Sequence, residues 1–180
     1  LEAQLEPFFE TLEQRVPLRA VAEATPDDLL IRHADYEGRA DPHLWIVPEL
    51  WQHAVTATRD ALTDILPEQA DRLAERSETY LSEITAVGAY ARGLLEKVPQ
   101  DQRVLVTAHD AFGYFGQSYG FDVEGIQGIS TESEAGLQRI GALVDLLVAR
   151  RIGAVFVESS VSDRNIRALI EGAAAQGHEV

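Results

Sequence analysis

Apolar residues recur at helical spacing through the first half of the chain. Residues 1–12 carry a helical apolar pattern with Pro7 near its start, and another helical pattern begins near Pro48. Between them, the short apolar run Val16–Ala22 predicts a weak strand, and Asp27–Arg39 has no clean period and predicts a loop. These patterns predict two helices that are separated by less regular chain.

The longest helical signal follows Pro67 and ends before Pro99. Two sets of residues, offset by four positions, each recur every seven residues along it: Leu73, Tyr80, Val87 and Leu94, and Ser77, Ile84, Ala91 and Val98. A stripe of this length predicts one helix of about thirty residues. The helix could pack along a core or act as a spine between two lobes, and the α/β pattern that follows favours the spine.

Short apolar runs alternate with helical patterns in the rest of the chain. The expected strands are Val104–Thr107, Phe121–Ile126 and Ile152–Val157. Helices are expected over residues 110–118, from a capping box at Thr131–Glu134 through Val148, and over residues 163–175. Gly120 should end the first of these helices, and Gly177–Val180 predicts a turn and the start of another strand. Strands that alternate with helices in this way form a parallel sheet with right-handed crossovers.

These elements predict the α/β class, with two lobes that contain parallel sheets and flanking helices and are joined by the long helix. We expect residues 1–66 to belong to an N-terminal lobe, residues 67–99 to form the linking helix, and residues 100–180 to belong to a C-terminal lobe. Because the chain starts at Leu1 and contains no Met, we expect it to be a segment that is truncated at both ends.

The charge balance argues against one class of partner. The 180 residues hold 15 Lys and Arg against 30 Asp and Glu, which gives a formal net charge of −15. A surface this acidic repels phosphate backbones, so nucleic acid is not an expected partner. The chain has no Cys, which excludes thiolate metal ligands and cysteine nucleophiles. No apolar run approaches the roughly 20 residues of a membrane helix.

Two histidines are candidates for chemistry because of their positions. His109 follows the first expected strand, and open parallel sheets bind ligands beyond the carboxyl ends of their strands. His43 lies between Pro42 and the bulky Leu44–Trp45 pair, which should hold its backbone in place. For each histidine, position alone fits a structural role about as well as a functional one. If the long helix is a spine, the two imidazoles lie on different lobes, and neutral imidazoles suit zinc and other first-row metals.

Three further residues leave other interpretations open. A carboxylate at the end of an apolar strand is costly unless it is paired, so Glu158 is expected to orient a ligand or bond backbone donors rather than bind metal itself. His33 lies in a polar loop and is expected to be solvated. One alternative function is an α/β enzyme that uses His109 with Asp110 or Glu158 as acid and base. Another is a fragment or scaffold that has no ligand.

At these residues the sequence resembles a known family, the solute-binding receptors of zinc and manganese ABC importers (cluster A-I). Residues 41–45 read Asp-Pro-His-Leu-Trp and resemble the ligand loop of the family's first lobe. Residues 107–115 read Thr-Ala-His-Asp-Ala-Phe-Gly-Tyr-Phe and resemble the ligand motif of its second lobe. Residues 125–134 and 156–162 are also similar to the family. The resemblance covers nearly the whole chain, and the paired His motifs on either side of a long helix make it specific.

The resemblance implies a receptor that binds a zinc or manganese ion between two lobes as its transported ligand. It implies that His43 and His109 bind the metal directly, and that a monomeric receptor delivers the ion to an ABC transporter permease without catalysis. It further implies a periplasmic or extracellular location, with the protein tethered to the membrane or free. The family usually has another His before the position of Leu1 and a carboxylate after that of Val180, so we expect this chain to hold two of the ligands.

Overall fold

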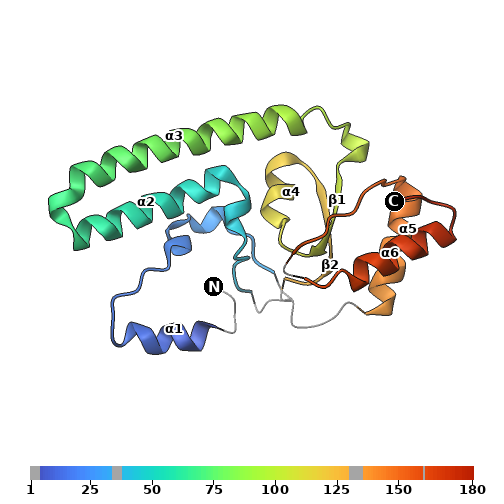
Figure 1. Cartoon of the computed structure of the whole chain (residues 1–180), viewed down its shortest axis with the longest axis horizontal. Helices are drawn as coiled ribbons and strands as arrows, with labels where there is room; N and C mark the ends of the chain where they lie inside the picture. Colours follow the sequence, from blue (N-terminus) through green and yellow to red (C-terminus); the bar gives the residue numbers. More distant parts are fainter. Residues whose placement is uncertain (1–4, 34–37, 130–135, 160) are drawn as a thin grey trace. The chain divides into compact units, whose positions relative to one another are not determined.

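The chain forms two compact units, Leu1–Leu94 and Leu95–Val180 (Figure 1). The computed structural model describes residues 5–33, 38–129, 136–159 and 161–180. Mixed helix and parallel sheet confirm the expected α/β class. The finer division into residues 1–66, 67–99 and 100–180 stays a prediction, as does the role of the long helix as a link.

The first unit is mainly helical. Its α-helices are α1 (Glu6–Glu13), α2 (Pro48–Ile65) and α3 (Ala70–Leu95), whose last residue belongs to the second unit. Short 3-10 helices lie between them: η2 (Val21–Ala24), η3 (Asp27–Leu29), η5 (Leu44–Ile46) and η6 (Pro67–Gln69). The strand pairing among the described residues of this unit is one antiparallel bridge, between Arg32 and Ala40. The three helices predicted from apolar periodicity are therefore confirmed, although α3 ends at Leu95, a few residues earlier than expected.

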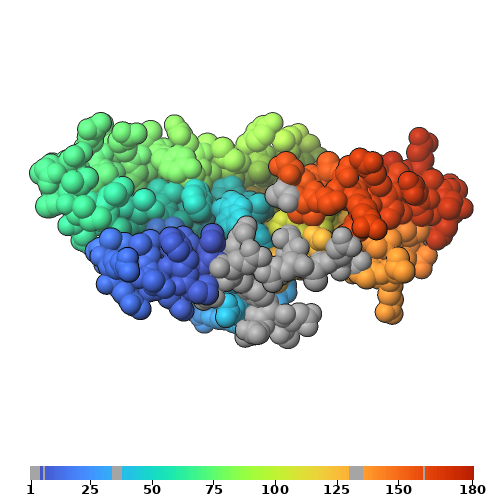
Figure 2. Space-filling view, turned by 60° about the horizontal axis from the view of Figure 1, so that its bottom comes forward, coloured from blue at the N-terminus to red at the C-terminus, as the bar shows by residue number. Residues whose placement is uncertain are grey.

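Helices α2 and α3 are held together by side chains from the first turns of α2, and their atoms form one continuous surface (Figure 2). Gln52 Nε2 donates to Thr85 Oγ1 over 2.9 Å, and Arg92 pairs with Glu49 over 3.1 Å near the start of α2. A Cβ atom on Gly88 of α3 would lie 3.3 Å from Glu49 Oε1, so the small residue permits this approach. The packing fixes the start of α2, which immediately follows the loop that carries His43.

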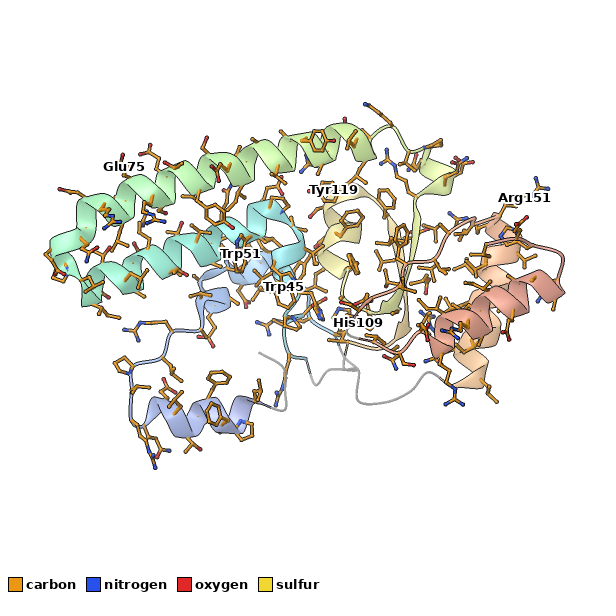
Figure 3. All side chains as sticks on the ribbon, viewed as in Figure 1. Trp45, Trp51, Glu75, His109, Tyr119 and Arg151 are labelled. Atoms are coloured by element: carbon orange, nitrogen blue, oxygen red, sulfur yellow. The ribbon has the colours of Figure 1, made fainter. Side chains whose placement is uncertain are left out.

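The two sets of residues in the α3 stripe have different environments. Ser77 and Ile84 are buried, but Tyr80, Val87 and Leu94 are 47%, 58% and 43% exposed. The set that contains Tyr80, Val87 and Leu94 is therefore largely unburied among the described residues. Trp51 of α2 points toward α3, where its Nε1 donates to Tyr80 Oη over 3.4 Å (Figure 3).

The second unit is built on two parallel strands, β1 (Val104–His109) and β2 (Asp122–Gln127). The helices of this unit are α4 (Gly113–Tyr119), α5 (Leu137–Arg150) and α6 (Arg164–Ala175), and η7 (Gln100–Gln102) precedes β1. Gly120 ends α4 with a φ of 71°, as predicted, because glycine tolerates this left-handed conformation. The predicted capping box at Thr131–Glu134 lies outside the described residues, and α5 begins at Leu137.

Helices α5 and α6 cover one face of the sheet and build its core. The buried side chains that meet there include Val106, Ala108 and Ile126 from the strands and Leu143, Leu147, Ile166 and Leu169 from the helices. A Cβ atom on Gly172 of α6 would lie 2.7 Å from Val144 Cγ2 of α5, so glycine allows these helices to pack closely. With Ala108 and Ile126 facing the core, their neighbours His109 and Gln127 face the opposite side of the sheet.

Three strand predictions were wrong. Residues 17–20 have no regular structure, and most of the Val16–Ala22 run is exposed, so it has no apolar face to bury. Ile152–Val157 makes only a bridge, in which Phe156 N donates to Val106 O over 2.9 Å. Phe156 and Val157 are 52% and 66% exposed, since no strand among the described residues pairs with their outer side. Residues 178–180 do not begin a strand, and His178 Nε2 instead lies 2.7 Å from Ile152 O.

The core of the second unit gives a direct stability prediction. Leu147 of α5 is fully buried, so Leu147→Ala should lower the free energy of unfolding by about 2–5 kcal/mol through lost burial and the cavity left behind. Leu137 in the same helix is 92% exposed, and Leu137→Ala should change it by no more than about 0.5 kcal/mol. Urea unfolding of the two variants checks this packing, and equal losses would contradict it.

Candidate metal centre

His43 is held by the carboxylate of Asp41, two residues before it. The backbone N–H of His43 donates to Asp41 Oδ1 over 2.9 Å, and His43 Nδ1 lies 2.7 Å from the same oxygen. The Asp41 side chain is fully buried, and the His43 side chain is 10% exposed. Asp41 N in turn donates to Ile31 O over 2.8 Å, which anchors the loop. One carboxylate oxygen thus fixes both the backbone and the ring of His43.

Residues on both sides of His43 define its surroundings further. Leu44 and Val47 are each 2% exposed and anchor η5 in the core of the first unit. The ring of Trp45 meets the His43 imidazole edge-on with centroids 5.2 Å apart, and Trp45 itself is 51% exposed. His33 Nε2 lies 3.7 Å from Asp41 Oδ2, and the His33 side chain is 30% exposed. His33 therefore lies beside Asp41 and is partly buried, not solvated as expected.

His109 (Figure 3) is the last residue of β1. It is held in the same manner by Glu158. The backbone N–H of His109 donates to Glu158 Oε1 over 3.1 Å, and His109 Nδ1 lies 2.6 Å from Glu158 Oε2. The two side chains are 13% and 19% exposed. Thr107 Oγ1 also donates to His109 O over 2.8 Å. Glu158 thus makes the orienting contact that its position at the end of an apolar run predicted.

The two carboxylates have the same chemical consequence in both units. A carboxylate beside Nδ1 favours the tautomer that carries its proton there, and this leaves the lone pair of Nε2 for a metal ion or a substrate proton. Each histidine is therefore oriented as a nitrogen donor through Nε2. The same pairing of His109 with Glu158 would also suit general base catalysis, so the geometry alone does not separate a metal ligand from an acid–base residue.

No group of three or more His, Asp and Glu side chains suited to hold a metal ion occurs in the part of the chain that the structure describes. His43 belongs to the first unit and His109 to the second, so each unit supplies one oriented imidazole. Asp110, the alternative partner of His109, donates its backbone N–H to Gln127 O over 3.0 Å.

Sequence reasoning assigned no role to two residues that the structure brings to these histidines. Asp41 belongs to the Asp-Pro-His motif, and its position two residues before His43 is the spacing at which an Asp side chain bonds a following backbone N–H. Gln127 ends β2 and pairs in register with His109. The sequence signal for Gln127 is weaker, because the sequence of one strand does not determine which residues it pairs with in its neighbour.

Comparison with known proteins shows the family to which the chain belongs. All 180 residues match the family described as zinc-uptake complex component A, periplasmic. The chain belongs to this family. The resemblance carried by the two His motifs is therefore confirmed, and the family is one of metal-binding transport receptors.

Two relatives in this family match the chain over its whole length. The manganese-binding lipoprotein MntA of Bacillus subtilis is 41% identical over 181 residues, and the zinc-binding protein TroA of Treponema pallidum is 36% identical over 182 residues. The chain spans 58% of the length of each. The solved structure of periplasmic zinc-binding TroA from Treponema pallidum superposes with a TM-score of 0.93 at 36% identity, over 98% of this chain and 63% of that one.

Among residues 5–33, 38–129, 136–159 and 161–180, no helix combines the length and the apolar character needed to cross a bilayer.

Proposed function

We propose that the protein is an extracytoplasmic receptor that binds a zinc or manganese ion through His43 and His109 and delivers it to the permease of an ABC importer. The metal ion is its cargo and no reaction is catalysed. The protein acts in the periplasm or outside the cell, tethered to the membrane or free, and as a monomer. Membership of the zinc-uptake family supports this class of function.

The observation that carries the proposal is the matched orientation of one imidazole in each unit. His43 and His109 are both mostly buried, and each has its Nδ1 within 2.7 Å of a carboxylate oxygen. Such a partner fixes the orientation and tautomer of the ring, which is the usual arrangement of metal-binding histidines. Two imidazoles that are oriented in this way, one in each unit, suit the binding of one shared ion.

The choice between zinc and manganese depends on the donors that complete the site. Zinc in proteins takes about four ligands, and imidazole nitrogen suits several first-row metals. The relatives named above are described as binding manganese in one case and zinc in the other, although both are similar to this chain along all of it.

Metal titration of the intact protein tests this function. The chain contains two Trp residues, and Trp45 meets the His43 ring, so a Trp51→Phe variant leaves a single fluorescent reporter beside the proposed ligand. We expect zinc or manganese to change the Trp45 emission and to saturate at one ion per protein in calorimetry with a competing chelator. Failure of both metals to bind would contradict the proposal.

Glu158→Gln should weaken metal binding without removing a ligand. The amide keeps one oxygen acceptor, but its NH₂ group can turn toward His109 Nδ1 and favour the other tautomer, so we expect affinity to fall by about 10-fold. Nitrogen-15 NMR of the imidazole should show the proton of His109 shift from Nδ1 toward Nε2. The exposed Glu171→Gln variant of α6 controls for loss of one negative charge. An unchanged tautomer with unchanged affinity would show that Glu158 does not orient His109.

A further inference from the structure

Gln127 lies directly beside His109 on the sheet. It is the last residue of β2 and the register partner of His109, the last residue of β1. Residues paired in neighbouring strands project from the same face, so the amide of Gln127 and the imidazole of His109 share the face opposite to the core residues Ala108 and Ile126. Both lie at the carboxyl end of parallel strands, where ligands bind.

The Gln127 side chain is buried without a partner for its oxygen. The residue is 9% exposed, and its Oε1 atom is buried and has no hydrogen bond partner among the described residues. A buried amide oxygen that is left unsatisfied costs about 1–3 kcal/mol, and native proteins rarely contain one without a reason. A buried oxygen of this kind beside an oriented imidazole indicates a binding site for a cation that oxygen and nitrogen atoms can coordinate.

Backbone contacts fix the position of Gln127 relative to His109. Asp110 N donates to Gln127 O over 3.0 Å, which ties the residue after His109 to the end of β2. A Cβ atom on Gly125 would lie 2.5 Å from Asp110 N, so glycine is needed for the two strand ends to approach this closely. The amide of Gln127 and the ring of His109 are thus positioned by the same rigid strand pair.

We propose that Gln127 is a further residue of the metal site and that its amide oxygen binds the cargo cation next to His109. The inference rests on the proposed receptor function. Carbonyl oxygen is a donor that manganese accepts readily, and imidazole nitrogen serves both manganese and zinc. Because the amide is neutral, it adds a donor without adding charge. The unsatisfied oxygen of the metal-free protein then gains its partner when the ion binds.

Gln127→Leu in the intact protein tests the proposal, because its two expected effects have opposite signs. Affinity for Mn²⁺ should fall at least about 10-fold. The melting temperature of the metal-free protein should stay the same or rise, since an apolar group replaces a buried oxygen that has no partner among the described residues. The matched control is Gln102→Leu, the same change at an exposed position of the second unit, which should leave affinity unchanged.

Gln127→Glu keeps an oxygen donor and provides the second arm of the test. We expect it to bind Mn²⁺ within about 10-fold of the wild-type protein. If Gln127→Leu lowers the melting temperature of the metal-free protein, its loss of affinity could come from misfolding, and the Mn²⁺ affinity of Gln127→Glu then tests the proposal. Loss of Mn²⁺ binding in Gln127→Glu would overturn it. Unchanged affinity in Gln127→Leu would also overturn it. A wild-type protein that binds neither metal would instead contradict the receptor function itself.

Discussion

Replacing His43 or His109 with alanine is expected to lower the affinity for zinc and manganese by at least about 100-fold. Loss of an outer partner of a metal ligand alone reduces affinity about 10–100-fold, and loss of the ligand itself should exceed that range. Both imidazoles are held by carboxylates and are mostly buried, so each substitution removes a nitrogen donor whose position is fixed. Calorimetry of the intact protein with a competing chelator measures the change.

The double variant separates one shared ion from two independent ones. If His43 and His109 bind the same ion, the losses of the two single variants should be strongly non-additive, because the first substitution already removes the joint site. If each binds its own ion, each single variant should lose one of two equivalents of metal. His53→Ala serves as the control, since it removes an imidazole from α2 rather than from either of the two His motifs. Affinity equal to wild type in both single variants would exclude these residues from the site.

Asp41→Ala is expected to reduce both metal affinity and stability. The substitution leaves the His43 N–H and Nδ1 without the oxygen that they share, and Asp41 is fully buried. We expect the free energy of unfolding to fall by about 1–3 kcal/mol through the unpaired groups. We expect metal affinity to fall about 10–100-fold as the ring loses its fixed orientation. Metal titration and urea unfolding measure the two effects.

Two controls distinguish the orienting role of Asp41 from a general loss of acidic charge. Asp28→Ala removes a carboxylate from an exposed position of η3 and should change neither quantity. Asp41→Asn keeps one oxygen acceptor for the His43 N–H, so its loss of stability should be smaller than that of Asp41→Ala. An Asp41→Ala protein that binds metal with wild-type affinity would contradict the orienting role.

Sequence periodicity predicted the elements that bury an apolar face against a partner. Helices α2, α3, α5 and α6 and the strands β1 and β2 each pack in this way, and all were expected close to their observed bounds. Ile152–Val157 has the composition of a buried strand, but a strand also needs backbone pairing with a neighbour along its length, and Phe156 makes only one bridge, to Thr107. That information is not in the segment itself. The same limit explains Val87 of α3, which has the apolar character of a core residue and is 58% exposed.

The two candidate histidines could be singled out from the sequence, but most of the residues that contact them could not. Position at the end of β1 identified His109, and the Asp-Pro-His motif drew attention to His43. The contact of His109 with Glu158 joins residues 49 positions apart, and that of Gln127 with His109 depends on strand register. Contacts of this kind form only when the chain folds, so composition and spacing cannot specify them.

The central claim is that one ion is bound jointly by an imidazole from each unit. Crystals of the intact protein loaded with zinc allow it to be tested by anomalous diffraction at the zinc edge. The account predicts a single anomalous peak about 2.0–2.1 Å from Nε2 of both His43 and His109. A peak bound to only one of these nitrogens, or separate peaks at the two histidines, would contradict it.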